Sequence, residues 1–279
     1  MVLSSNTNST YTKISKKRTL RNRMNTKPNI LPLKLKDVSF EVNGMRYLKD
    51  INFILNAGSN TIVLGPNGAG KSLFLRICHG LIVPTNGSTN WGGPSTQKPE
   101  ISQAMVFQKP VMLKRSVIEN LHFGLKCRGI SKTNRDPIIA KIIERIGLSR
   151  LSKTPARSLS TGEQQRLAIG RAWALKPEVL FLDEPTANLD PAATHVVEGI
   201  IKSIKETGTT ILMSTHDLGQ ARRLADNILF LYRGRILEKS SVEQFFTSPK
   251  NDLAQAFIKG ELLWWHRKKL KPPSELKTY

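Results

Sequence analysis

The 279-residue sequence lacks several features that define large classes of proteins. It has only two cysteines, Cys78 and Cys127, and neither lies in a CxxC pair or at a metal-ligand spacing with histidine. This argues against a disulfide framework and predicts a reducing compartment such as the cytoplasm. No apolar run approaches the roughly 18 residues that cross a bilayer, and no apolar signal segment opens the sequence. We therefore expect no membrane span in the chain itself.

Acidic residues are missing from the N-terminal region. Residues 1–36 carry nine Lys and Arg and no Asp or Glu, and the whole chain has a net charge of +22. Because the first thirty residues are also rich in Ser, Thr and Asn, we predict a disordered basic extension over residues 1–32. A basic tail is predicted over residues 261–279. Three interpretations of the extension stay open: a solvated tail, attraction to anionic lipid headgroups, and RNA binding or a transit peptide. No specific nucleic-acid partner is expected.

Between these ends, short apolar segments indicate an α/β protein. "LKLKDVSFEV" at 33–42 and "RYLKDINFIL" at 46–55 alternate as strands do. The segments "TIVL" at 61–64, "VLFL" at 179–182 and "TTILM" at 209–213 are continuous apolar runs, which are typical of strands buried on both faces of a sheet.

A glycine-rich loop, "GPNGAGKS", joins the first continuous run to a helical pattern, and this context predicts a phosphate site. Its glycines let successive backbone N–H groups face one concavity, and the following helix adds partial positive charge at its N-terminus. Lys71 would reach the β and γ phosphates, and Ser72 would offer a hydroxyl to Mg²⁺. The predicted nucleotide-binding residues of the loop are Gly65, Pro66, Asn67, Gly68, Ala69, Gly70, Lys71 and Ser72.

Polar residues follow the other two continuous runs, at the sheet edge where ligands of open α/β sheets bind. Asp183 and Glu184 come directly after "VLFL", and alternation turns their side chains in different directions. We expect Asp183 to hold Mg²⁺ and Glu184 to polarise a water in line with the γ-phosphate. His216 follows "TTILM" and is expected to contact the γ-phosphate.

With these motifs, about residues 33–260 resemble the ATPase subunits of ATP-binding cassette (ABC) transporters. The family's motifs occur in order: "GPNGAGKS" as Walker A, "VFQ" as the Q-loop, "LSTGE" as the signature motif, "VLFLDEP" as Walker B, "ANLD" as the D-loop and His216 as the switch histidine. The resemblance implies a P-loop NTPase fold, with a RecA-like α/β core, an antiparallel β part and a helical subdomain inserted at about 110–168.

The resemblance also implies ATP and Mg²⁺ as cofactors. Gln108, Glu184 and His216 would act in catalysis, and Ser72, Gln108 and Asp183 would surround the metal.

The signature stretch "LSTGEQQR" has a meaning of its own as a helix start. Ser160 followed three residues later by Glu163 is a capping box, which marks a helix N-terminus with free N–H donors. In the family, two cassettes pack head to tail. The resemblance therefore implies a homodimer in which Ser160 and Gly162 of one copy contact ATP held by the other. Thr161 and Glu163 stand where the family usually has glycine and glutamine.

The residue that stacks on adenine is not settled by the sequence. The family's usual aromatic position falls on Val42, and Phe40 and Tyr47 flank it. Strand alternation does not decide which of the two aromatic residues faces the nucleotide.

The resemblance favours an importer whose ATPase is a separate subunit, peripheral on the inner face of the cell membrane. Its partners would be an integral membrane permease and, through the permease, a solute-binding protein. The segment after Gln108 resembles the region that receives a coupling helix, with Val111, Met112, Leu113 and Val117 available for a groove. The cargo would be an oxyanion such as tungstate or phosphate. Polar amino acid import, or a soluble ABC ATPase not tied to transport, are the alternatives.

Overall fold

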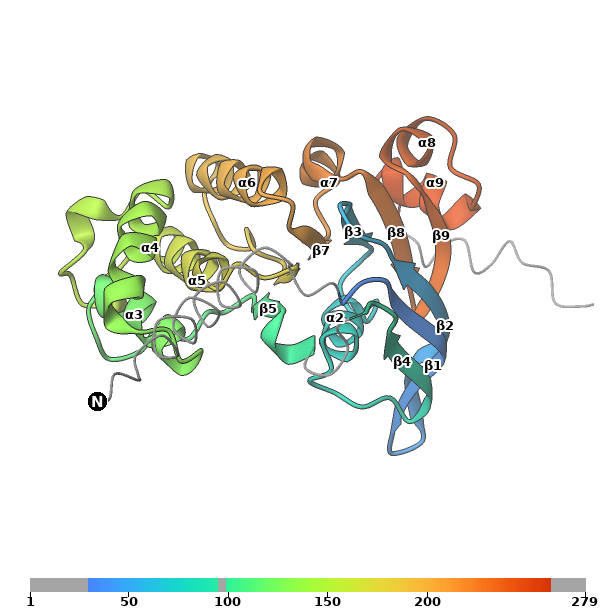
Figure 1. Ribbon diagram of the computed structural model, residues 1–279. Helices are drawn as coiled ribbons and strands as arrows, with labels where there is room; N and C mark the ends of the chain where they lie inside the picture. Colours follow the sequence, from blue (N-terminus) through green and yellow to red (C-terminus); the bar gives the residue numbers. More distant parts are fainter. Residues whose placement is uncertain (1–29, 95–98, 262–279) are drawn as a thin grey trace, which may run out of the picture.

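The structure is a computed structural model that describes residues 30–94 and 99–261 (Figure 1). Most of the predicted basic extension and C-terminal tail lies outside the described residues. The described chain begins with Ile30 and Leu31, whose side chains are buried in the core.

The main sheet positions the functional site. Within the described residues it has six strands in the order β5-β6-β7-β3-β8-β9. The first five are parallel to their neighbours, and β9 is antiparallel to β8. Its strands are β3 (Asn60–Leu64), β5 (Gln103–Val106), β6 (Val179–Asp183), β7 (Thr210–Thr215), β8 (Asn227–Tyr232) and β9 (Arg235–Ser241).

Both faces of this sheet are buried, which confirms the interpretation of the continuous apolar runs. Ile62 and Leu64 of β3 belong to a hydrophobic cluster that includes α6 (Pro191–Glu206). Val63, which points the other way, belongs to a second cluster that includes α2 (Lys71–His79). The two clusters together enclose the sheet.

A smaller antiparallel sheet covers α2 (Lys71–His79) on the side away from the main sheet (Figure 1). Its strand order is β2-β1-β4, and the bounds are β1 (Leu33–Val42), β2 (Met45–Leu55) and β4 (Asn86–Trp91). Phe53 of β2 and Phe74 of α2 pack edge to face, with ring centroids 5.4 Å apart. The predicted antiparallel β part is therefore confirmed.

A helical part, inserted between β5 and β6 in the chain, projects from one end of the main sheet (Figure 1). Its helices are α3 (Val117–Cys127), α4 (Lys132–Arg145) and α5 (Thr161–Ala174), with the short 3-10 helices Ser149–Leu151 and Ala156–Ser158. This confirms the inserted helical subdomain.

The remaining helices pack near the main sheet or follow its last strand, β9. They are a 3-10 helix at Pro99–Ile101 and the α-helices α6 (Pro191–Glu206), α7 (Leu218–Leu224), α8 (Val242–Thr247) and α9 (Asp252–Ile258). Over the part of the chain that the structure describes, no helix is both long and apolar enough to cross a membrane.

Candidate nucleotide site

A cavity of about 880 Å³ opens where β3, β6 and β7 end, at the carboxyl edge of the parallel strands. Its lining combines most of the predicted site residues with the D-loop. The predicted residues that line it are Asn67, Gly68, Ala69, Gly70, Lys71, Ser72, Gln108, Glu184 and His216. Segments more than a hundred residues apart in the chain thus form one site.

The phosphate loop needs its glycines for two different reasons. Gly68 and Gly70 have φ values of 77° and 103°, which other residues rarely adopt. Gly65 has no such φ, but a Cβ on it would collide with the carbonyl oxygen of Leu231 in β8. The loop is therefore shaped both by its own backbone and by a neighbouring strand.

Lys71 is buried within the loop, with 5% of its side chain exposed. Its Nζ donates to the carbonyl oxygens of Gly65 and Pro66 at 2.9 and 3.2 Å, and it lies 3.1 Å from Glu184 Oε1. The ammonium group is thus held at the floor of the phosphate cradle. Gly65 and Pro66 contribute to the site through these carbonyl groups rather than through the cavity lining.

Ser72 and Asp183 meet directly behind the loop. Ser72 Oγ donates to Asp183 Oδ1 at 2.8 Å, and Ser214 Oγ donates to the same oxygen at 2.8 Å. Asp183 is buried, and the β6–β7 register pairs it with Ser214. One hydroxyl and one carboxylate are a sparse set of hard oxygen ligands, which fits Mg²⁺ because that ion keeps several waters and phosphate oxygens. No cluster of three acidic, His or Cys residues competes for a metal among the described residues.

Glu184 stands between two nitrogen groups at the mouth of the cradle. Lys71 Nζ lies 3.1 Å from Oε1, and His216 Nδ1 lies 3.3 Å from Oε2. The Glu184 backbone has a φ of 44°, an uncommon conformation for a residue with a side chain. It is held there because the Glu184 N–H donates to Ser214 Oγ and to the Ser214 carbonyl, at 3.0 and 3.2 Å. Ser214 was not among the predicted site residues, although it opens the "STHD" segment.

The signature residues are beside this cavity but not in its lining, since a Cβ on Gly162 would lie 3.9 Å from Leu189, a lining residue. Ser160 and Gly162 are at the N-terminus of α5, outside the cavity lining. Ser160 Oγ accepts the Glu163 N–H at 3.4 Å, and the Glu163 carboxylate accepts the Ser160 N–H at 2.9 Å, which confirms the predicted capping box. Within one copy, therefore, these residues do not reach the chain's own phosphate loop.

Of the three residues considered for adenine stacking, only Tyr47 lines the cavity. Its side chain is half exposed, whereas Phe40 packs against the core cluster around α2. The turn between β8 and β9 lies directly against the Tyr47 carbonyl, which a Cβ on Gly234 would meet. There, Gly234 accepts the Lys49 N–H at 2.8 Å and donates to the carbonyl of Ala69 at 2.9 Å.

The expected apolar groove after Gln108 is only partly present. Val111 is 71% exposed, but Met112 and Val117 are buried in the core of the helical part. The expectation that these two side chains are available to a partner is wrong, because both are buried in the hydrophobic cluster of the helical part. Arg171 of α5 donates to the Val111 carbonyl at 2.9 Å and thereby fixes the exposed position.

The fold and the cavity define a P-loop nucleoside triphosphatase. Residues 48–187 match the family model of the ABC transporter. A phosphate import ATP-binding protein of Mycoplasmoides gallisepticum is 38% identical over 232 residues, which cover 77% of this chain and 71% of that protein. A tungstate uptake system ATP-binding protein of Peptoclostridium acidaminophilum is 42% identical over 183 residues, covering 65% of this chain and 86% of that protein. The chain therefore belongs to the ABC transporter family and forms its ATPase subunit.

Solved structures agree. The cbiO1 protein of Clostridium perfringens, part of an ABC transporter complex, superposes with a TM-score of 0.70 at 27% identity, covering 82% of this chain and 95% of that one. An ATP-binding cassette in a dimeric post-hydrolysis state, bound to ADP and phosphate, gives a TM-score of 0.68 at 26% identity, covering 75% of this chain and 98% of that one.

Proposed function

We propose that this subunit hydrolyses Mg-ATP to energise import of a small oxyanion through a separate membrane permease. The observation that carries the hydrolytic part is the position of Glu184, between Lys71 and His216 at the mouth of the phosphate loop. A carboxylate there can take a proton from water beside a bound γ-phosphate.

In this proposal the phosphate loop binds the nucleotide before any chemistry occurs. The N-terminus of α2 and the loop N–H groups bind phosphate oxygens, and Lys71 exchanges its contact with Glu184 for the β and γ phosphates. Ser72, Asp183 and Gln108 would hold Mg²⁺, which would supply positive charge against the phosphates.

Hydrolysis then depends on the carboxylate that Lys71 has released. Glu184 accepts a proton from water as the water oxygen bonds to the γ-phosphorus and the bond to the departing ADP oxygen breaks. His216, which is half exposed at the rim, holds Glu184 from one side and contacts the transferred phosphate.

The proposal requires a second copy of the chain. Ser160 and Gly162 are outside the lining of their own cavity, on a capped helix N-terminus that is suited to bind an anion. In a head-to-tail homodimer they would close over the nucleotide of the partner. The dimeric cassette with ADP and phosphate supports this arrangement.

Support for the cargo comes from the relatives. Two of them are named for phosphate import and tungstate uptake, which favours a tetrahedral oxyanion. Polar amino acid import is the second candidate, because a glutamate transport ATP-binding protein of Corynebacterium efficiens is 34% identical over 240 residues. With permease and solute-binding protein reconstituted in vesicles, phosphate, tungstate and glutamate should differ in how strongly they stimulate ATP hydrolysis. Stimulation by glutamate alone would reverse the order of the candidates.

The catalytic proposal is tested by Glu184→Gln, which keeps the size of the side chain but removes its basicity. We expect steady-state phosphate release from saturating Mg-ATP to fall by about 100-fold or more, the contribution of a general base. ATP affinity, measured by calorimetry, should stay within a few-fold of the parent. Glu206→Gln, an exposed site at the end of α6, is the control and should change neither quantity. Near-parent hydrolysis by Glu184→Gln would refute the role.

A further inference from the structure

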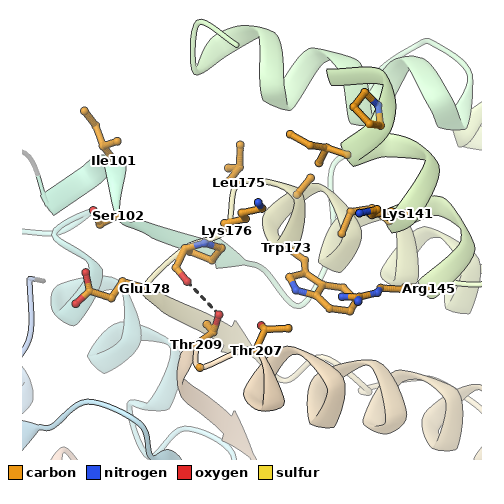
Figure 2. A pocket seen from close by; sticks show the side chains of 16 residues that line it. Ile101, Ser102, Lys141, Arg145, Trp173, Leu175, Lys176, Glu178, Thr207 and Thr209 are labelled. Carbon is orange, nitrogen blue, oxygen red and sulfur yellow. Dashed lines mark hydrogen bonds between the residues drawn. The ribbon is translucent and has the colours of Figure 1, made fainter. Parts of the chain in front are cut away.

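A second cavity, of about 660 Å³, lies at the opposite edge of the main sheet (Figure 2). It sits where β6 and β7 begin, whereas the nucleotide cavity sits where they end. Its walls come from α4, the end of α5, the segment leading into β6, and the turn between α6 and β7. The two cavities share no lining residue, so this one is not part of the ATPase site.

Three cationic side chains line the second cavity: Lys141 and Arg145 from α4, and Lys176 after α5 (Figure 2). Within the described part of the chain, none of them is in an ion pair. The one acidic residue of the lining, Glu178, already accepts the backbone N–H of Ile30 at 2.9 and 3.1 Å. Three cationic side chains and one carboxylate thus leave the lining with a net positive charge.

The rest of the lining is largely apolar. Trp173 is only 3% exposed, and the Arg145 guanidinium lies over its ring, 4.9 Å from the ring centroid. Ile138, Leu175 and Pro177 complete the apolar surface around the indole. Pro177 is held in place because its carbonyl accepts the Thr209 hydroxyl at 3.1 Å (Figure 2). The cavity volume falls in the range of small-molecule sites, roughly 300–1,000 Å³.

We propose that this cavity binds a small amphipathic anion, with a flat apolar body and one carboxylate, sulfonate or phosphate group. The body would pack on the apolar wall around Trp173, and the acidic group would pair with Lys141 and Lys176. Because α4 belongs to the helical part and Pro177 to the approach to the main sheet, a bound ligand contacts both. Its binding therefore depends on how the two parts are placed relative to one another.

Two fluorescent probes that share an apolar body test the proposal. Anilinonaphthalene sulfonate is anionic, and N-phenylnaphthylamine is the neutral counterpart. Titrations use the full chain with saturating Mg-ADP, so that the nucleotide cavity does not contribute. The variant Lys141→Gln/Lys176→Gln should lower the affinity for the anionic probe by about 10-fold or more, since two charge-assisted contacts are removed. The affinity for the neutral probe should stay within 2-fold of the parent.

The matched control is Lys153→Gln/Lys202→Gln, which removes two exposed lysines outside the lining. It should leave the affinity for both probes unchanged. Ile138→Trp, which fills the cavity, should lower the affinity for both probes. Thermal unfolding of each variant checks that the fold persists. If the Lys141→Gln/Lys176→Gln variant and the Lys153→Gln/Lys202→Gln variant bind the anionic probe with equal affinity, the proposal is overturned. Binding of the anionic probe that survives Ile138→Trp would also overturn it.

Discussion

The side chain of Tyr47 supplies the aromatic surface of the nucleotide site. Tyr47 is the one Phe, Tyr or Trp among the lining of the nucleotide cavity, and its carbonyl oxygen would be 3.4 Å from a Cβ on Gly70 of the phosphate loop. An aromatic ring at this rim offers a flat surface for a base.

We predict that Tyr47→Ala raises the Kd for ATP by about 2- to 10-fold, because stacking contributes about 0.5–1.5 kcal/mol. Val42→Ala, at the position that the family pattern singles out, should change ATP affinity by less than 2-fold. Calorimetric titration of both variants decides between them. A larger loss with Val42→Ala than with Tyr47→Ala would contradict the assignment.

The choice between Phe40 and Tyr47 could not be made from the sequence for a physical reason. The β1–β2 pairing contains register shifts between Leu35 and Val38, between Val38 and Phe40, and between Phe40 and Glu41. Each bulge interrupts the two-residue alternation on which a sequence argument depends. By contrast, the positions of the phosphate loop and of Glu184 at the sheet edge could be read from the sequence, because each follows a continuous apolar strand that has no bulge.

At the scale of elements, the turn between β8 and β9 supports the whole nucleotide site. Gly234 is bonded to Ala69 of the phosphate loop and to Lys49 of β2. It has a φ of 77°, and a Cβ there would collide with the carbonyl of Tyr47. One turn therefore fixes the base side and the phosphate side of the cavity together.

Gly234→Ala should therefore weaken both stability and nucleotide binding. We expect the free energy of unfolding to fall by about 2–4 kcal/mol from backbone strain and overpacking, and the Kd for ATP to rise. Gly129→Ala is the matched control, because Gly129 has a φ of 71° with no atom within 4 Å of the added Cβ. The free energy of unfolding of this control variant should fall by only about 1 kcal/mol. Urea unfolding and ATP titration measure both effects, and equal losses in the two variants would exclude a supporting role for this turn.

The elements themselves were largely predictable, but their assembly was not. The strands at 61–64 and 179–182 and the helix after the phosphate loop appear where the apolar pattern placed them. Met112 and Val117 resemble groove residues in the sequence because an apolar side chain gives the same signal whether it packs inward or outward. The contact of Ser214 with Asp183 depends on strand order, which a single sequence does not fix.

At the scale of the whole molecule, the proposed homodimer divides the ATPase site between two copies. Glu184→Gln should accumulate as a dimer at saturating ATP, because unhydrolysed nucleotide stabilises the state that binds it best. Adding Ser160→Arg should restore the monomer, since a long side chain would crowd the partner's phosphates. Size-exclusion chromatography with and without ATP measures the change.

The control for this dimer is Glu184→Gln with Ser149→Arg, which places the same side chain on an exposed residue of another helix, outside the signature stretch. That protein should still dimerise with ATP. A Ser160→Arg variant that dimerises equally well would mean that "LSTGEQQR" is only a helix start.

The strand order of the main sheet also affects how the chain folds while it is being translated. β3, which leads into the phosphate loop, pairs with β7 on one side and β8 on the other, and both are encoded far downstream. At about 5–20 residues per second, the ribosome needs roughly ten to thirty seconds to proceed from the end of β3 to the end of β8. During that interval both hydrogen-bonding edges of an apolar strand lack their native partners. A nascent chain cannot complete the sheet around its nucleotide cradle before β8 has been translated, and until then β3 is an exposed apolar segment that chaperones can shield.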